Sequence, residues 1–433
     1  MDPQEIDVVV RNRGWKARLR GFFSPVPLLG WLLGALAAVI LEHLVGEELS
    51  EVLGFSNIPM LFGISSMLKT PSMIPSSLLY VLSIYILPIC IVARLSAVVA
   101  NPAAEKLLTV STLLSGVVHL GLLYAVLHFW TDVGDYRLIT LRLMLIAIMV
   151  NLSLNVVNGY MGEFSCSHPG FMALGAYGAS VFSLVLFVDN NKFTGAPLLP
   201  PELGPFLFPV GLVVGGMVAA LGALVVAIPS FKTRGDYLAV ISLAFTFIVK
   251  SLIENLEIVG GARGMSGEPA YANLPTVFIW TVLCVWIINN FVRSTMGKAL
   301  NAVRDDETAA SAMTVNTRET KIVAFLFAAF WAGVAGGLFA HVLRYVNPGT
   351  FGLQSLADVL AMLYLGGLNS VYGSIVGAVG LNLLSEALKP LEIYKWIIIP
   401  VLVILVMVYR PTGLIAFRDF DVEKILQPRR KVR

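Results

Sequence analysis

Few side chains in this sequence could do chemistry, and those that could are polar groups set among long apolar runs. Glu163, Ser165, Ser167 and His168 lie close together, and Asp358 stands within LADVLAMLYLGG. Ionisable and polar groups are costly at membrane depth, so each needs a function or a partner there. We expect the first four to line a solute path, with Glu163 or His168 contacting the solute or stabilising the bent backbone. Alternatively, this stretch lies at the cytoplasmic surface and its side chains are hydrated. Asp358 either lines a cavity or is hydrated near the outer surface.

Catalytic signatures are missing from the sequence. Gly297-Lys298 is followed by Ala299, so the chain lacks the phosphate-binding loop that would let it hydrolyse ATP. The G-x-S-x-G and H-E-x-x-H patterns are also absent, and the five histidines are scattered. The three cysteines are far apart and indicate neither a disulfide framework nor a zinc site. We therefore predict a protein that is not an enzyme, holds no metal and binds no cofactor directly.

The elements that position these polar groups are predicted to be membrane helices. Apolar residues make up 57% of the 433 residues and charged residues 13%, and the mean hydropathy is +0.82. These values exclude an ordinary water-soluble domain. We expect an all-α polytopic membrane protein with about 10–12 transmembrane or re-entrant helices. The apolar segments fall at 25–45, 73–93, 107–129, 138–158, 169–188, 206–229, 236–253, 275–292, 322–343, 353–388 and 396–410.

The distribution of Lys and Arg predicts that both termini are cytoplasmic, because cytoplasmic connections carry an excess of these residues. Residues 1–24 form one basic tail and residues 411–433 another. Basic pairs, Arg94 with Lys106 and Lys232 with Arg234, would then mark cytoplasmic connections. The opening residues lack the residue order of a cleaved signal peptide. We expect a multi-pass protein whose first helix is oriented by the cluster Arg11, Arg13, Lys16, Arg18 and Arg20.

Two interruptions divide the apolar segments. The first break is Asn158–Gly170, and the second break is Gly366–Gly373, which lies inside a stretch too long for one ordinary span. We expect residues 353–388 to form two short helices that either cross twice or re-enter. Broken helices at corresponding places suggest an internal repeat and indicate where a transporter handles its solute, so Gly366, Gly367 and Asn369 are candidate path residues. Alternatively, the glycines only permit close helix packing.

One polar stretch, Arg293–Lys321, separates two long apolar runs in the second half of the chain. Its charges alternate in sign and alanine recurs among them. This pattern predicts one or two short helices lying in water beside the membrane. Such a stretch either contacts a partner or is a solvated connector, and the pattern alone leaves both interpretations open.

Four stretches, in this order along the chain, resemble the permease subunits of binding-protein-dependent ABC importers for branched-chain amino acids, a LivM-like family. The first, NVVNGYMGEFSCSHPGFMALGAYGA, is similar to the family's N-L-x-x-G-Y-x-G-x-x-S-x-G-H-x-x-F-x-x-x-G-A-Y. The resemblance makes residues 138–410 the permease core and leaves the helices of 25–130 outside it. Ser167 and Thr314 each stand where the family usually has Gly. The four stretches are 155–179, 234–245 with 260–267, 296–310 with 321–325, and 365–378.

The resemblance implies that residues 293–321 are a cytoplasmic coupling loop that contacts an ATPase. Its E-x-A-A-like centre is Glu307, Ala309 and Ala310, flanked by Arg304, Asp305 and Asp306. It also implies a second permease subunit in a hetero-dimer, two cytoplasmic ATPase subunits that use ATP, an extracytoplasmic solute-binding protein, and a place in the bacterial inner membrane, with no nucleic acid. The alternatives are a related importer for urea or short amides, a self-sufficient secondary transporter or channel, and a structural membrane scaffold.

Overall fold

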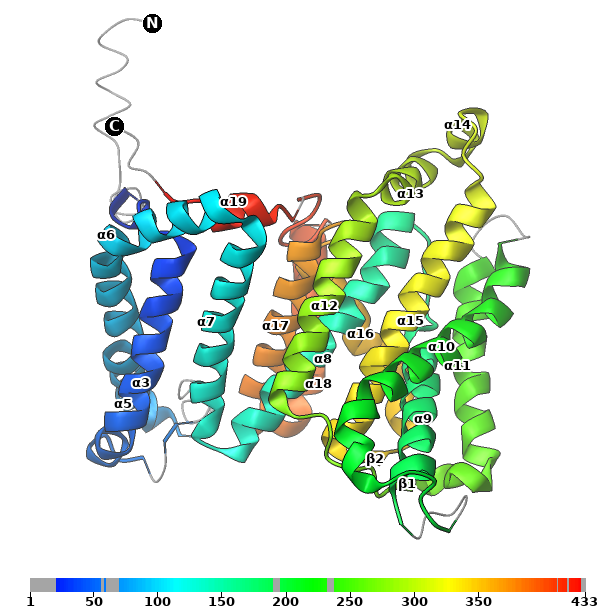
Figure 1. The fold of residues 1–433 in the computed structure, drawn as a ribbon, viewed down its shortest axis with the longest axis horizontal. Coiled ribbons are helices and arrows are strands. Elements are labelled where there is room, and N and C mark those ends of the chain that lie inside the picture. Colours follow the sequence, from blue (N-terminus) through cyan, green and yellow to red (C-terminus); the bar gives the residue numbers. More distant parts are fainter. Residues whose placement is uncertain are drawn as a thin grey trace, which may run out of the picture. The chain divides into compact units, whose positions relative to one another are not determined.

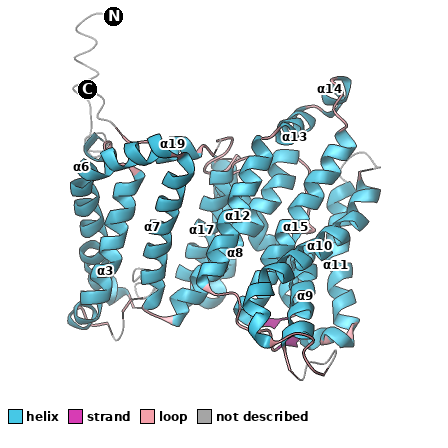
Figure 2. Cartoon of the chain, viewed as in Figure 1, coloured by secondary structure: helices cyan, strands magenta, loops and turns pink. Residues whose placement is uncertain are grey.

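The computed structural model describes residues 21–55, 58–59, 70–189, 195–231, 237–410, 412–418 and 420–429. The basic N-terminal cluster, Lys232 with Arg234, and the last four residues lie outside these ranges. Within the described residues, nine helices are long and apolar enough to cross a membrane, and three shorter apolar helices accompany them. Helix is the dominant structure throughout (Figure 2). The prediction of an all-α polytopic membrane protein is therefore confirmed.

The chain forms two compact units. Unit 1 comprises the residues up to Arg137 together with those from Asp421 onward, and unit 2 comprises Leu138–Phe420. Unit 1 contains α3 (Leu28–Val52), α5 (Ile74–Tyr80), α6 (Leu87–Val110), α7 (Thr112–Asp132) and the short α19 (Val422–Leu426), with a π-helical turn joining α5 to α6.

Helix α6 runs through the stretch that the sequence marks as a connection. Arg94 and Lys106 were predicted to mark a cytoplasmic connection, and α6 continues through both positions to Val110 and includes Pro102. The reason is a stripe of alanines, Ala93, Ala97, Ala100 and Ala104, which are all buried. Alanine has the highest helix propensity, and its small side chain lets α6 pack closely against α3.

A buried ion pair lies inside unit 1. Glu42 is 0% exposed and Arg137 5% exposed, and two guanidinium nitrogens donate to the two carboxylate oxygens at 2.9 and 3.0 Å. Tyr80 donates its hydroxyl to the same carboxylate at 3.1 Å, and Tyr85 donates to the other oxygen. The guanidinium also lies over the ring of Trp130. A charged pair is tolerated at this depth because its polar atoms have partners.

Unit 2 contains the remaining helices and a two-stranded sheet. The central helices α9, α10 and α15 pack against one another. A β-carbon on Gly175 would lie 2.1 Å from the carbonyl oxygen of Gly333, so glycine is required for α9 and α15 to approach this closely. The elements are α8 (Asp135–Asn155, whose first residues belong to unit 1), α9 (His168–Phe187), α10 (Gly204–Ser230), α11 (Tyr237–Asn255), β1 (Met265–Ser266), α12 (Leu274–Arg293), α13 (Thr295–Asp305), α14 (Glu307–Ala312), α15 (Thr317–Leu343), β2 (Tyr345–Val346), α16 (Leu353–Gly366), α17 (Val371–Ala387) and α18 (Lys395–Tyr409).

The two ends of unit 2 differ in character. Strands β1 and β2 pair antiparallel, with Met265 opposite Val346, at one end of the helices. Helices α13 and α14 lie at the opposite end (Figure 1). The stretch 353–388 forms two short helices, α16 and α17, separated by the second break, as predicted.

Candidate functional site

The polar stretch 293–321 folds into α13 and α14, two short helices with defined ends. Ser294 caps α13 by accepting from the amide of Gly297 at 3.4 Å. Asp306 caps α14 more strongly, because its carboxylate accepts from two amides of the first turn at 2.8 and 3.0 Å. N-terminal caps of this kind satisfy amides that have no partner within the helix. Asp306 therefore has a structural role in addition to its charge.

The six predicted coupling residues do not all face the same way. Asp305, Asp306, Glu307 and Ala309 are exposed, and Ala310 is 4% exposed. A partner would therefore meet Ala309, while the small side chain of Ala310 sets how closely α14 packs onto its own unit. The exposed face ends at Met313, which is 77% exposed. The sequence analysis did not single out this residue.

Lys321 joins the coupling loop to the first break. Its ammonium lies 2.7 Å from a carboxylate oxygen of Glu163 and 2.9 Å from one of Glu307. The Lys321 side chain is only 11% exposed, whereas those of Glu163 and Glu307 are 27% and 52% exposed. Two residues predicted for different roles, a path residue and a coupling residue, thus share one cation. The sequence analysis treated Lys321 only as the end of the loop.

Arg304 contacts the same break from α13. One guanidinium nitrogen donates to the carbonyl of Gly159 at 3.4 Å, and two others donate to Asp305 at 2.7 and 2.9 Å. Gly162 has a left-handed backbone with a φ of 77°, and a β-carbon there would lie 2.3 Å from Cγ of Arg304. The break therefore turns at a glycine against which the Arg304 side chain lies.

The inner part of the first break is packed into the protein. Ser165, Ser167 and His168 are each 0% exposed. The hydroxyls of Ser165 and Ser167 lie 2.8 Å apart, and the amide of Ser165 donates to the side chain of Asn158 at 3.2 Å. His168 packs edge-on against Phe171. These contacts match a fixed bend in the backbone, one of the alternatives that the sequence left open.

Asn155 connects the first break to the second. Its side-chain oxygen accepts from the amide of Asn369 at 3.0 Å, and its nitrogen donates to the carbonyl of Ser370 at 3.0 Å and the hydroxyl of Ser374 at 2.6 Å. Gly367 has a φ of 125°, and a β-carbon there would lie 2.6 Å from the carbonyl of Ile415. The two breaks, separated by about two hundred residues, are thus neighbours in space. Each helps to satisfy the irregular backbone of the other, which lipid could not do.

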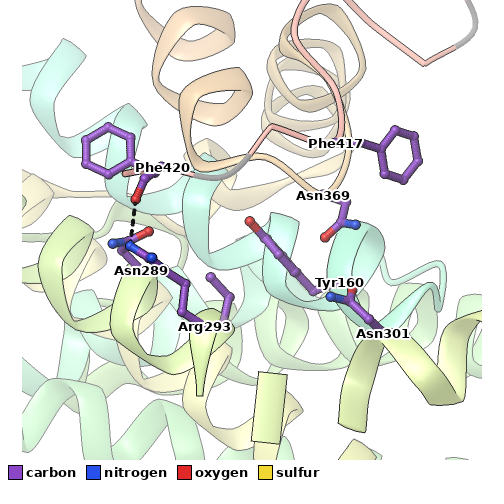
Figure 3. A pocket seen from close by; sticks show the side chains of 8 residues that line it. Tyr160, Asn289, Arg293, Asn301, Asn369, Phe417 and Phe420 are labelled. Atoms are coloured by element: carbon purple, nitrogen blue, oxygen red, sulfur yellow. Dashed lines mark hydrogen bonds between the residues drawn. The ribbon is translucent and has the colours of Figure 1, made fainter. Parts of the chain in front are cut away.

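A small cavity lies where these elements meet, with a volume of about 90 Å³. Figure 3 shows the side chains around it, which come from α12, α13, both breaks and the segment after α18. On one side, Arg293 donates to the carbonyl of Phe420 at 3.4 Å. The cavity has room for ordered water. Two of the lining residues were named from the sequence, Asn369 as a path residue and Arg293 as the start of the coupling loop. The lining consists of Tyr160, Asn289, Val292, Arg293, Asn301, Asn369, Phe417 and Phe420.

Asp358 is not part of this group. It lies on α16 more than two turns before Gly366, toward the end of that helix that follows β2. Another carboxyl that the sequence analysis missed, Glu268, lies just after β1 and is 0% exposed. Its backbone carbonyl accepts from Arg344 at 3.3 Å, and burial raises the pKa of its carboxyl. Both carboxyls therefore lie outside the cluster of the coupling loop and the breaks.

Broken helices that are neighbours in space within a helical membrane protein are a recurring feature of transporters. The family model described as "Branched-chain amino acid transport system / permease component" matches residues 136–408. The chain belongs to this family, and the match begins close to the predicted start of the core at residue 138.

Individual relatives agree with this assignment. The high-affinity branched-chain amino acid transport system permease protein LivM of Escherichia coli K12 is 31% identical over 322 residues, covering 66% of this chain and 71% of LivM. LivH of the same strain, a permease protein of the same description, is 25% identical over 290 residues, covering 64% of this chain and 92% of LivH. A probable branched-chain amino acid transport permease protein LivM of Methanocaldococcus jannaschii is 24% identical, covering 62% of this chain and 89% of that protein. No solved structure matches the chain.

Proposed function

We propose that this chain is one permease subunit of an ATP-driven importer that carries branched-chain or other hydrophobic amino acids through the bacterial inner membrane. The observation that carries the proposal is the exposed helix α14, which lies at one end of unit 2. Its Glu307 pairs with Lys321, and Lys321 also pairs with Glu163 of the first break. A solvated connector needs no such tie. The printed names of the relatives supply the solute class, which we extend to this chain.

The remaining components follow from the same reasoning. The chain lacks a phosphate-binding loop, so ATP is used by two separate cytoplasmic ATPase subunits and the chain itself binds no cofactor. One strain has both LivM and LivH, and this chain is similar to both, which supports a second, different permease subunit. An extracytoplasmic binding protein delivers the solute. A self-sufficient carrier or a scaffold would need no exposed coupling helix, and no specific observation favours a urea or short-amide importer.

Ala309→Trp tests the coupling assignment, because Ala309 is exposed on α14 and the buried Ala310 is not a clean position for a bulky residue. We expect the ATPases to co-purify with the wild-type chain in mild detergent and to associate about tenfold more weakly with Ala309→Trp, since a bulky side chain prevents a close helix contact. The control is Ala270→Trp, at an exposed alanine near β1 at the other end of unit 2. Equal recovery of ATPases with both variants would contradict the coupling role of α14.

A further inference from the structure

We propose that Lys321 and Arg304 are positioning residues that transmit the movement of α13 and α14 to the first break. This inference rests on the proposed function and adds to it the side chains through which the transporter is coupled. The first break is the element moved, because both cations reach it from the coupling loop.

The contact through Lys321 is specific because one ammonium pairs with two carboxylates. Glu163 and Glu307 belong to segments far apart in sequence, and each carboxylate lies within 3 Å of the same ammonium. Without the cation, Glu163 would have no partner there and the two carboxylates would repel each other. Lys321 is also held in the first turns of α15, so it is part of a rigid helix rather than a loop. A displacement of α14 therefore moves Glu307, which shares the Lys321 ammonium with Glu163.

The contact through Arg304 is steric as well as polar. Gly162 has no side chain, and Cγ of Arg304 occupies the space beside its α-carbon, while the guanidinium donates to Gly159. Movement of α13 toward the break is thus transmitted directly to the backbone. Arg304 contacts the turn from α13, whereas Glu307 of α14 reaches it only through Lys321 of α15.

The break passes this movement on to the interior of unit 2. It contains Tyr160, which lines the cavity, and it follows Asn155, which holds Asn369 and Ser370 of the second break. Packed interiors transmit displacement rather than absorb it. A shift of the first break therefore changes the cavity and the second break together. Contacts that only stabilise the fold would look the same. The test must therefore measure the coupling of solute uptake to ATP hydrolysis rather than stability.

The experiment uses the full chain, assembled with its second permease subunit and ATPases in lipid vesicles and supplied with the binding protein and leucine. Solute uptake and ATP hydrolysis are measured in the same vesicles. We expect Lys321→Met to lower uptake per ATP about tenfold while hydrolysis stays within about twofold of wild type. Lys321→Arg keeps a cation that can reach both carboxylates and should restore uptake per ATP. Lys389→Met, which removes a cation paired with Glu386 outside the coupling loop, is the matched control.

Glu163→Gln provides a second measurement that changes no residue of the coupling loop. It can be made even if Lys321→Met fails to insert into the membrane. It should lower uptake per ATP in the same direction, and it should add nothing in the Lys321→Met background because both changes break the same link. Fully additive losses would overturn the link.

The possible outcomes separate the inference from the proposed function. If the wild-type chain recruits no ATPase or takes up no leucine, the proposed function fails. If the wild type is coupled and Lys321→Met keeps the wild-type uptake per ATP, only the inference fails. It also fails if Lys321→Met loses uptake and hydrolysis in equal proportion or does not bind the ATPases, because Lys321 would then support assembly and not transmission.

Discussion

Arg137→Met should destabilise unit 1 severely, because the buried Glu42 carboxyl would lose its cation. The carboxylate is 0% exposed and would lose two charge-assisted hydrogen bonds of 2.9 and 3.0 Å. Within the described part of the chain it would keep the hydrogen bonds from the hydroxyls of Tyr80 and Tyr85. Removing one partner of a buried ion pair costs about 3–5 kcal/mol. The loss of packing over Trp130 adds to this cost. The expected loss is therefore near the upper end of that range.

The assay is thermal unfolding in mild detergent, followed by tryptophan fluorescence. For a cooperative unit of this size, each kcal/mol lowers the melting temperature by about 2–4 °C, so a fall on the order of 10 °C is expected. Arg94→Met is the control, because Arg94 is partly exposed and lies over a single ring, that of Phe22. We expect its effect to stay below about 1 kcal/mol.

A double variant decides whether the cost comes from the stranded charge. Glu42→Gln combined with Arg137→Met removes both charges, so it should be more stable than Arg137→Met alone. The reasoning is refuted if Arg137→Met melts within about 1 °C of wild type. It is also refuted if the double variant melts lower than the single one.

Two further predictions concern stability. Thr314 has a φ of 67°, a left-handed conformation that favours glycine over a β-branched residue. Thr314→Gly should therefore stabilise the coupling loop by about 1 kcal/mol, measured as a higher melting temperature, and an equal or lower melting temperature would contradict the inferred strain. Burial raises the pKa of Glu268, so the stability it contributes is present below the unfolded pKa of about 4.3 and is lost as the pH rises through the folded value. In the wild type, the melting temperature should therefore fall as the pH rises through this range, and Glu268→Gln should reduce the fall. An unchanged dependence on pH in the variant would contradict this role of Glu268.

The hydropathy of the sequence was sufficient to predict the spans, and the clusters of glycine and polar residues predicted both breaks. Local composition carries this information, because each span must satisfy its own backbone within a helix. The continuation of α6 through Arg94 and Lys106 was not predicted, since the two basic residues indicated only a cytoplasmic connection. The packing of α6 against α3 is visible only in the structure.

The partners of charged groups could not be predicted. Glu42 and Arg137 are separated by 95 residues, and Lys321 and Glu163 by 158. No periodicity within one helix relates such positions, and each side chain alone is compatible with an exposed location. Their pairing becomes visible only when the helices are placed together. Asn155 is a similar case, because its hydrogen-bond partners in the second break are more than two hundred residues away in sequence.

The four polar residues of the first break belong to two different sites. Ser165, Ser167 and His168 are enclosed, whereas Glu163 reaches outward to Lys321. Sequence spacing could not separate them, because the left-handed turn at Gly162 removes the helical periodicity that would assign faces. Glu163 therefore belongs with the coupling loop, and its substitution should change the coupling of uptake to ATP before it changes which solute is carried. A Glu163→Gln variant with altered solute preference and normal uptake per ATP would instead assign Glu163 to the solute path.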